Sequence, residues 1–393
     1  MKVLIINTVC GTGSTGRISV DIYNVLKQNG DVCKIAYGRG EVKGIPESDT
    51  IKIGHMTGIY MHAFLSRLTD KSGFYSTYAT KKFIKQIEEY NPDVIHLHNI
   101  HGYYINVEIL FEYLAKADKK VVWTLHDCWS FTGHCAYFDY VGCDKWKNGC
   151  RECPQIDSYP KSYKDGSKKN YNKKKELFTK VKDLTVVTPC MWLADNVKKS
   201  YLRTYPVRVI YNGIDFTYFK PVESDFKEKH GLQSKKIILA VANIWEPRKG
   251  FGELLKLKDI LGDGYRIVVV GNPGDNQIPE DMIHIGRTNS QTELAELYSA
   301  ADVFVIPSFE DNFPTVNIEA LACGTPVISY NTGGSPEAAN ETCGVTVENT
   351  PEAMADAIVN LDKYGFTKES CLKRAEYFDK NERFKEYLKI YNE

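Results

Sequence analysis

The residues best suited to bind a ligand lie between Pro307 and Val327, where an apolar strand leads into an acidic turn, a helix and a second strand. Two carboxylates of this stretch, Asp311 and Glu319, are eight residues apart, which predicts one on the loop and one on the helix. Open α/β sheets bind phosphorylated ligands where such a loop meets a helix amino terminus. Two carboxylates there can hold two hydroxyl-bearing parts of one ligand.

An adjacent pair of cations, Arg248 and Lys249, follows another apolar strand, Ile238–Val241. Arginine presents a planar fork of donors and lysine a point charge, and both suit phosphate oxygens. At a strand-to-helix junction the pair can neutralise a diphosphate. A solvated basic dipeptide is the alternative, but the acidic segment around Asp311 in the same half of the chain favours a phosphate site.

A glycine-rich loop, Gly11–Gly16, follows the first predicted strand and has the pattern G-x-G-x-x-G. Its glycines permit positive φ and a close approach of a ligand to the backbone. A dinucleotide-binding unit also needs an acid at the end of the second strand, where this chain has Arg39. Arg39 keeps open the alternative of an NADP-dependent oxidoreductase that uses this loop. A plain tight turn is the remaining interpretation.

Histidines stand at the ends of two predicted strands, His126 on one and His98 on the other, with Asn99 beside it. A metal cluster would need an acidic partner at ligand spacing, and we find none near His96 and His98. We predict instead that His98 and Asn99 contact an acceptor substrate and that His126 projects toward the ligand. A satisfied core histidine is the alternative for His126.

Cysteines crowd into one segment, with five of the eleven lying between Cys128 and Cys153. A closing C-x2-C with two upstream thiols can form a tetrahedral zinc site, which would staple an insertion of about residues 128–160. Free thiols are the alternative. The predicted zinc ligands, which are structural and not catalytic, are Cys135, Cys143, Cys150 and Cys153.

A run of nine lysines between Lys161 and Lys182 faces only Asp165 and Glu176. Tyrosines, a leucine and a phenylalanine are interleaved. One interpretation is a solvated loop and helix, and the other is a peripheral contact with an anionic membrane.

Two sets of alternating strands and helices must position these residues, and such alternation predicts two parallel-sheet lobes. We predict an N-terminal lobe of residues 1–205, completed by a charged helix from about 370 to 393, and a C-terminal lobe of residues 206–369. The predicted strands are Lys2–Asn7, Val32–Tyr37, Val94–His98, Val121–His126, Leu184–Thr188, Ile237–Ala242, Arg266–Val270, Met282–Ile285, Val303–Ile306 and Val327–Ser329.

The 393 residues carry balanced charges, so composition gives no reason to expect a nucleic-acid partner. The first residues read as a strand and not as a signal peptide, and no apolar run reaches transmembrane length. We therefore expect a cytoplasmic protein, with a peripheral position at the inner face of the membrane if the lysine run binds lipid.

The stretch from Pro307 to Val327 resembles the donor-sugar signature of glycosyltransferase family 4, in which two glutamates are separated by seven residues. Asp311 takes the place of the first glutamate, and Glu310 lies beside it, so both remain candidates for the sugar contact. Segments similar to that family also occur at 209–215, 285–287 and 332–337. The resemblance covers the C-terminal lobe nearly throughout and the N-terminal lobe in patches.

The resemblance implies an α/β fold of the GT-B type, with two Rossmann-like lobes facing a cleft and a C-terminal helix that returns to the N-terminal lobe. It implies Arg248 and Lys249 on the donor diphosphate, Glu319 on the ribose, and Asp311 or Glu310 on the sugar. His126 would support the reacting sugar. The remaining donor-binding candidates are Gly13, Arg287, Phe313 and Thr315.

The expected function is that of a retaining glycosyltransferase that moves a sugar from a nucleotide-sugar donor to a saccharide acceptor. The family subgroup that assembles polysaccharides implies a lipid-linked acceptor and cell-surface polysaccharide biosynthesis. No metal or other cofactor is expected in catalysis, because the basic residues replace the metal of Asp-x-Asp transferases. A sugar-binding protein without turnover is a further alternative.

Overall fold

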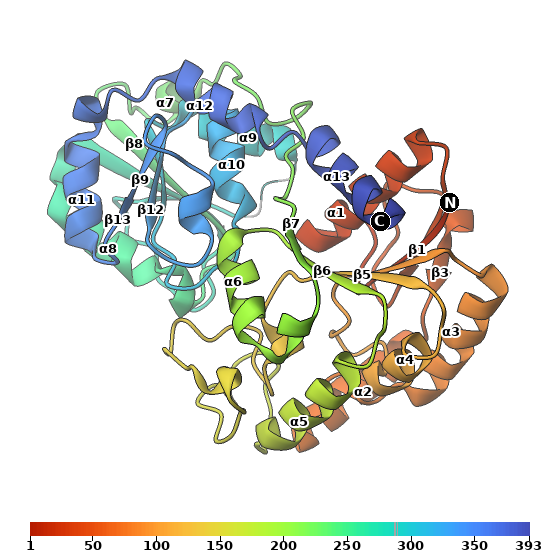
Figure 1. The fold of residues 1–393 in the computed structure, drawn as a ribbon. Helices are drawn as coiled ribbons and strands as arrows, with labels where there is room; N and C mark the ends of the chain where they lie inside the picture. The colour runs from red at the N-terminus through yellow and green to blue at the C-terminus, as the bar shows by residue number, and fades with distance from the viewer. Residues whose placement is uncertain (287, 289) are drawn as a thin grey trace. The chain divides into compact units, whose positions relative to one another are not determined.

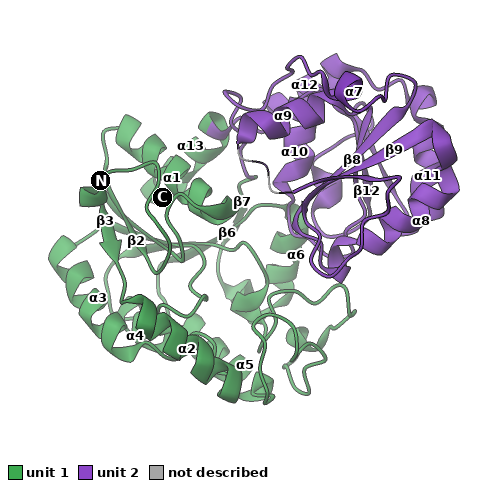
Figure 2. Cartoon of the chain, turned by 180° about the vertical axis from the view of Figure 1, so that it is seen from behind, with its two compact units in different colours: residues 1–211, 381–393 green, residues 212–380 purple. Residues whose placement is uncertain are grey.

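The computed structural model of this chain describes residues 1–286, 288 and 290–393. Two compact units make up the structure, as Figure 2 shows: residues 1–211 with 381–393 form unit 1, and residues 212–380 form unit 2. The predicted boundaries between the two lobes lie near residues 205 and 370. In the structure the chain leaves unit 1 after Tyr211 and returns to it after Lys380.

Unit 1 contains one sheet of parallel strands. The strands are β1 (Lys2–Asn7), β2 (Val32–Tyr37), β3 (Thr50–Lys52), β4 (Val94–Leu97), β5 (Lys120–Thr124), β6 (Leu184–Thr188) and β7 (Val207–Val209). They lie in the order β3-β2-β1-β4-β5-β6-β7, and every pair is parallel. Val3, Leu4, Ile5 and Ile6 of β1 are fully buried, as expected for a parallel strand covered on both faces.

Helices cover both faces of this sheet (Figure 1). They are α1 (Gly13–Gln28), α2 (Met56–Thr69), α3 (Thr77–Tyr90), α4 (Val107–Leu114), α5 (Ser167–Phe178), α6 (Met191–Lys199) and α13 (Lys380–Asn392). Helices α1 and α13 share one apolar core with β1 and β2, in which Ile22 and Phe384 meet Val3 and Ile5. Helices α2 to α5 lie on the opposite side of the sheet in Figure 1.

Unit 2 repeats this architecture with six strands. They are β8 (Lys236–Ile244), β9 (Tyr265–Asn272), β10 (Ile283–Ile285), β11 (Val303–Ile306), β12 (Val327–Tyr330) and β13 (Gly344–Val347). Their order is β10-β9-β8-β11-β12-β13, again all parallel. The helices are α7 (Phe226–Lys229), α8 (Phe251–Leu261), α9 (Gln291–Ala300), α10 (Thr315–Ala322), α11 (Pro351–Val359) and α12 (Lys368–Glu376). The prediction of two parallel-sheet units is confirmed.

Each sheet has a point where its strand order reverses. In unit 1, β1 lies between β2 and β4, and in unit 2, β8 lies between β9 and β11. Open α/β sheets bind ligands at the carboxyl edge beside such a point. The glycine loop follows β1 and His98 follows β4, while Lys249 follows β8 and Asp311 follows β11. These predicted site residues therefore stand at their unit's switch point, and His126 follows β5, one strand further along the sheet.

The C-terminal tail differs from the single charged helix that the sequence predicts. It is divided into α12, which belongs to unit 2, and α13, which packs on unit 1. Between them Phe378 is fully buried, and its ring lies 5.8 Å from that of Phe313. On α13, the Tyr391 hydroxyl lies 2.7 Å from His96 Nδ1 and the Tyr387 hydroxyl 3.0 Å from Thr124 Oγ1. The return of the last helix to the first unit is thus confirmed.

The cysteine-rich segment after β5 contains only short turns of helix, at Trp129–Phe131 and Lys145–Lys147. Trp146 is its buried centre, and its ring lies 4.8 Å from that of Phe138 and 5.2 Å from that of Phe131. No helix among the described residues is both long enough and apolar enough to cross a membrane.

Candidate active site

In unit 2, the loops after β8 and β11 meet through charged side chains. The Lys249 ammonium forms an ion pair with Asp311, and the two side chains are 19% and 15% exposed. Arg248 donates from Nε to the Glu246 carboxylate at 2.9 Å and from Nη1 to the Glu310 carbonyl at 3.3 Å. The cations predicted to hold a diphosphate and the acid predicted to hold a sugar are therefore in direct contact.

Two glycines allow these loops to approach so closely. Gly250 has a φ of +76°, and a Cβ there would lie 2.1 Å from the Pro307 carbonyl oxygen. Gly333 has a φ of +57°, and a Cβ there would lie 1.7 Å from the Asp311 carbonyl oxygen. Only glycine fits such positions. The Gly334 amide also donates a hydrogen bond of 2.7 Å to the Asn312 carbonyl. This bond ties the loop after β11, called here the acidic loop, to the loop after β12.

Glu319 lies on α10 and is 6% exposed. One of its carboxylate oxygens accepts from the Tyr298 hydroxyl at 3.0 Å and the other from the Thr315 hydroxyl at 3.2 Å. Burial, together with the adjacent Glu319 charge, raises the pKa of Tyr298 well above its usual value. Each carboxylate oxygen has a second lone pair, so Glu319 is oriented by these bonds and can still accept from a ligand hydroxyl.

Three features of the acidic loop refine the predictions. Glu310 is 3% exposed, whereas the neighbouring Asp311 side chain is 15% exposed, so Asp311 offers more of its carboxylate to a ligand. Phe313 is buried and packs against Phe378. Its ring therefore has little exposed surface with which to make the predicted contact with the donor. Arg287 lies outside the described residues.

The amino end of α10 lacks a cap from its own N-cap residue. The helix begins at Thr315, and Pro314 at the N-cap position makes no side-chain hydrogen bond to the first amides. The first amides of a helix lack intrahelical partners and carry the positive end of the helix dipole. Together with Lys249 and Arg248, this helix end gives unit 2 two sources of positive potential beside Asp311.

In unit 1, the glycine loop is held by its own backbone. The Gly11 amide donates to the Gly16 carbonyl at 3.0 Å, and Asn7 Nδ2 donates to the carbonyls of Val9 and Thr15 at 3.0 and 3.1 Å. Gly13 has a φ of +64°, and a Cβ there would meet nothing within 4 Å. The loop is thus a tight turn whose glycines adopt positive φ, with open space beside Gly13.

The end of β2 is filled by a side chain. A Cβ on Gly38 would lie 2.3 Å from Cγ of Tyr104, which is itself 1% exposed. A dinucleotide would place its ribose at this strand end. The Tyr104 ring therefore occupies the region that the oxidoreductase alternative requires.

His98 and His126 form a stacked pair. Their rings are 5.2 Å apart and 13° from parallel, and His98 Nδ1 and His126 Nε2 share a hydrogen bond of 2.9 Å. Burial lowers the pKa of His126 to about 4 and holds the pKa of His98 well below its usual value. Both rings are therefore neutral near pH 7.

The burial of His98 argues against its predicted contact with an acceptor, whereas the contact predicted for Asn99 stays a prediction. His98 is 1% exposed and lies under His126, so it positions that ring and offers no surface to a saccharide. Asn99 is half-buried, and its carbonyl accepts from the Thr8 and Tyr104 hydroxyls at 3.0 and 2.9 Å. His126 is half-buried as a residue, whereas His98 is fully buried.

Three side chains near His126 were not predicted as site residues. His101 Nε2 lies 2.7 Å from the Asp127 carboxylate, and His101 Nδ1 lies 3.1 Å from the Tyr159 hydroxyl. Burial opposes ionisation of Asp127, but His101 and the Trp129 amide outweigh it and hold the Asp127 pKa below its usual value. Asp127 could have been predicted, because it is adjacent to His126 in the sequence. Tyr159 could not, because it is distant in sequence from these residues.

The four predicted zinc ligands lie near enough to one another to interact electrostatically. Cys135 and Cys153 share a side-chain hydrogen bond, which lowers the pKa of Cys153 to about 7 and raises that of Cys135. Cys150 accepts from the Gly133 amide at 3.1 Å. Within the described part of the chain, no three His, Cys, Asp or Glu side chains are placed to hold a metal ion. The zinc site remains a prediction without support from this arrangement.

The lysine run is not one solvated surface. Lys174 is 1% exposed and donates from Nζ to the carbonyls of Trp129 at 2.8 Å and Thr132 at 3.2 Å. Its ammonium lies 3.4 Å from the centroid of the Trp129 ring, and burial lowers its pKa to about 7. Lys173 forms an ion pair of 2.6 Å with Glu108. Lys174 therefore anchors the cysteine-rich segment to α5 and cannot contact a membrane.

Two family models match consecutive parts of the chain. The model described as Glycosyltransferase Family 4 matches residues 32–218, and that described as Glycosyl transferases group 1 matches residues 222–381. The junction between the matches lies near Tyr211, where the chain passes from unit 1 to unit 2.

Curated proteins of similar sequence carry transferase names. The chain is 28% identical over 362 residues to WcaC of Escherichia coli (strain K12), named as a colanic acid biosynthesis glycosyl transferase, with 88% of this chain and 87% of that protein covered. It is 29% identical over 172 residues to the D-inositol 3-phosphate glycosyltransferase of Mycobacteroides abscessus, which covers 39% of each chain.

Solved structures share the fold along the whole chain. Sucrose-phosphate synthase of Thermosynechococcus elongatus matches with a TM-score of 0.73 at 17% identity, covering 100% of this chain and 98% of that one. Anabaena Alr3699/HepE, solved in complex with UDP, matches with a TM-score of 0.68 at 15% identity and 99% coverage of both chains. These similarities confirm the predicted fold of the GT-B type.

Proposed function

The chain belongs to glycosyltransferase family 4, and from that premise we propose that it transfers a sugar from a nucleotide-sugar donor to a saccharide acceptor with retention of configuration. The observation that carries this proposal is the ion pair of Lys249 with Asp311 at the carboxyl edge of the unit 2 sheet, with Glu319 on the helix that follows the acidic loop. Membership of this family decides against the oxidoreductase alternative.

In this proposal each part of the donor has a chemically matched partner in unit 2. The diphosphate is held by Lys249, by Arg248 and by the amino end of α10, because these supply charge and donors to phosphate oxygens. Glu319 accepts from ribose hydroxyls, and its orientation by Tyr298 and Thr315 supports that role. Asp311 accepts from sugar hydroxyls and is favoured over Glu310 by its greater exposure.

The reaction breaks the bond between the anomeric carbon and the leaving phosphate oxygen and forms a new bond to the acceptor hydroxyl oxygen. When no covalent glycosyl-enzyme forms, retention requires the acceptor to approach the face that the phosphate leaves, so a phosphate oxygen can take the hydroxyl proton. Lys249 and the α10 amides stabilise the charge that develops on the diphosphate. His126, neutral at physiological pH, then acts through hydrogen bonding to the sugar and not as a charged acid.

Catalysis without a metal ion belongs to the same proposal, since Lys249, Arg248 and a helix end already supply positive charge to the diphosphate. Full activity after treatment with EDTA is the expected result. Strict dependence on added Mg²⁺ or Mn²⁺ would contradict this part of the proposal.

Polysaccharide assembly is the biological setting that we propose, on the basis of the similarity to WcaC over most of both chains. A lipid-linked saccharide would then be the acceptor. UDP and UDP-glucose are the first probes to use, because HepE was solved with both.

A screen of nucleotide sugars tests the proposal. A donor that binds the folded chain should raise its melting temperature. The same donor should be transferred to an acceptor or slowly hydrolysed, and NMR of the product should show the donor's anomeric configuration. Stabilisation without any turnover would favour a sugar-binding protein, and an inverted product would exclude the retaining mechanism.

A further inference from the structure

Helix α2 exposes an apolar stripe that none of the described elements covers. At about 100° per residue, the exposed side chains fall within a sector of about 140°, opposite the buried Ile59, His62 and Ser66. A helix at a protein surface normally presents polar residues to water, and a contiguous exposed apolar patch marks an interaction site. The stripe consists of Met56 at 40% exposure, Tyr60 at 68%, Met61 at 57%, Phe64 at 58% and Leu68 at 38%.

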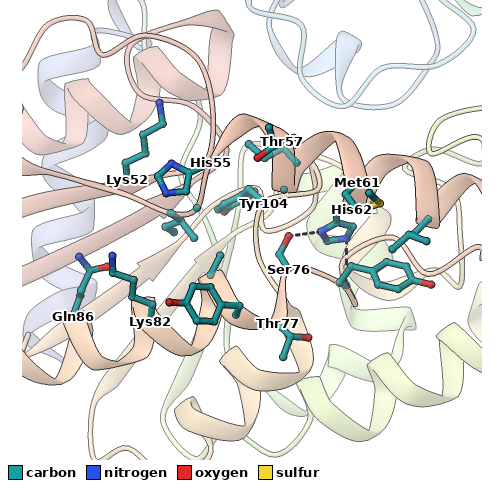
Figure 3. Close-up of a pocket in the computed structure, with 18 residues that line it drawn as sticks. Lys52, His55, Thr57, Met61, His62, Ser76, Thr77, Lys82, Gln86 and Tyr104 are labelled. Atoms are coloured by element: carbon teal, nitrogen blue, oxygen red, sulfur yellow. Dashed lines mark hydrogen bonds between the residues drawn. The ribbon is translucent and has the colours of Figure 1, made fainter.

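A cavity of about 570 Å³ opens beside this stripe, between α2 and α3 (Figure 3). Met61 and Leu65 line it from α2, and Tyr78, which is 84% exposed, lines it from α3. Lys52 and Lys82 line the same cavity, and Figure 3 shows both on one side of it and Met61 on the other. The cavity thus combines apolar walls with a cationic end.

His62 also lines the cavity but adds no charge. Its Nδ1 shares a hydrogen bond of 2.8 Å with the Ser76 hydroxyl, and its Nε2 accepts from the Gly73 amide at 3.2 Å. Burial lowers the pKa of His62 to about 4. The positive charge of the cavity therefore comes from its lysines.

The surface around the stripe carries mainly positive charge. Residues 50–90 contain six basic residues and three acids, Asp70 and, at the end of α3, the exposed Glu88 and Glu89. Asp70 is 2% exposed and lies 2.5 Å from His134, so it does not offset the surface charge. Among the described residues, no ion pair engages any of the six, which are Lys52, Arg67, Lys71, Lys81, Lys82 and Lys85, all exposed.

The exposed part of the lysine run continues this surface. The Tyr163 amide donates to the Arg67 carbonyl at 2.8 Å, and the Arg67 guanidinium lies 5.2 Å from the centroid of the Tyr163 ring. Figures 1 and 2 both show α5 beside α2. The lysines before and at the start of α5 that remain exposed are Lys161, Lys164, Lys168 and Lys169.

We propose that this α2 face, meaning the apolar stripe with the six basic residues around it, docks on an anionic lipid bilayer. Helix α2 would lie in the interface, with Tyr60, Met61 and Phe64 at the acyl boundary and the lysines among the phosphates. Apolar walls joined to a cationic end suit an amphiphile with an anionic head. A second copy of this chain is disfavoured as the occupant, because pairing two such faces would bring their like charges together.

Sedimentation of the full chain with lipid vesicles tests this proposal, which stands independently of the transferase reaction. Vesicles of phosphatidylcholine are compared with vesicles that also contain phosphatidylglycerol. The M61D/F64D variant removes the centre of the stripe, and the I260D/V359D variant is its control, since Ile260 and Val359 are 48% and 57% exposed on unit 2. The K81E/K85E variant reverses charge on the α2 face, and the K363E/K373E variant does so on unit 2.

The wild-type chain should bind only the anionic vesicles, and less as salt rises. M61D/F64D and K81E/K85E should each lower the partition coefficient by at least about tenfold. Burial of Met61 and Phe64 and attraction of the lysines to anionic lipid should contribute similar amounts to the free energy of binding. The two unit 2 variants should remain within about twofold of wild type.

Three results would overturn the proposal. They are no binding of the wild-type chain to anionic vesicles, equal binding by M61D/F64D and its control, and a wild-type dimer in solution that M61D/F64D converts to a monomer. All variants should keep melting temperatures near that of wild type, since the substituted side chains are exposed.

Discussion

Substitutions of Lys249 and Asp311 should have different effects on two ligands, a nucleoside diphosphate and its sugar conjugate. The two side chains form an ion pair, yet the proposed site assigns Lys249 to the diphosphate and Asp311 to the sugar. Lys249→Met should therefore weaken the binding of both ligands. Asp311→Asn should weaken only the sugar conjugate, and it should leave the bare diphosphate unchanged or bind it more tightly, because a competing negative charge next to Lys249 is removed.

The magnitudes follow from the partial burial of the pair. A unit charge on phosphate about 4 Å from the ammonium contributes about 4 kcal/mol before desolvation at an effective dielectric of about 20. Loss of one partner of such a contact costs about 2–4 kcal/mol net, which is about 30- to 1,000-fold in Kd. Loss of a charge-assisted hydrogen bond to a sugar hydroxyl costs about 1.5–3 kcal/mol, or about 10- to 150-fold.

Isothermal titration calorimetry of the chain with UDP and UDP-glucose, or with the base that a screen selects, measures both effects. Lys256→Met is the matched control, because Lys256 lies on the same unit and is 64% exposed. Melting temperatures without ligand would show whether a variant has lost stability instead of a ligand contact. Equal losses for both ligands in Asp311→Asn, or no loss for either in Lys249→Met, would refute the assignment.

Other predictions concern pH, the buried lysine and the cysteines. Burial lowers the pKa of His96 to about 3 and of His126 to about 4 from an ordinary 6.5. Between pH 6.5 and about 4 the unfolded chain therefore binds more protons than the folded chain. The free energy of unfolding should fall as pH falls through this range. Urea denaturation at several pH values measures this, and a flat profile would contradict it. Lys174→Met leaves the carbonyls of Trp129 and Thr132 without their donor and should cost about 2 kcal/mol of stability, whereas the exposed Lys175→Met should change it by less than about 0.5 kcal/mol; equal effects would show that Lys174 is not an anchor. Metal analysis of protein purified without chelator should find about one zinc per chain if Cys135, Cys143, Cys150 and Cys153 rearrange around a metal, and absence of zinc would establish them as free thiols.

Much of the fold could be predicted because the central strands are continuous apolar runs. Lys2–Asn7, Val32–Tyr37, Leu184–Thr188 and Val303–Ile306 have the predicted bounds. The short edge strands β3, β7 and β13 were missed, since each is only three or four residues long and partly exposed. Helix α2 would have been hard to predict, because its apolar side chains face water while His62 and Ser66 lie on its buried face, which reverses the pattern that identifies a surface helix.

The candidate site was predictable where one motif carries it. Asp311 and Glu319 sit on the loop and the helix that their spacing predicts. Contacts between distant residues could not be read from the sequence: the Tyr298 hydroxyl on Glu319 and the pairing of His98 with His126 depend on which strands become neighbours. The burial of Lys174 was likewise hidden, because its position in a lysine-rich helix resembles that of its exposed neighbours.

A crystal structure of the chain with a bound nucleoside diphosphate tests the central claim most directly. We predict that the phosphates lie against Lys249 Nζ and the first amides of α10, with the ribose hydroxyls on Glu319. Phosphates bound at the Gly11–Gly16 loop without any contact to Lys249 would contradict the account.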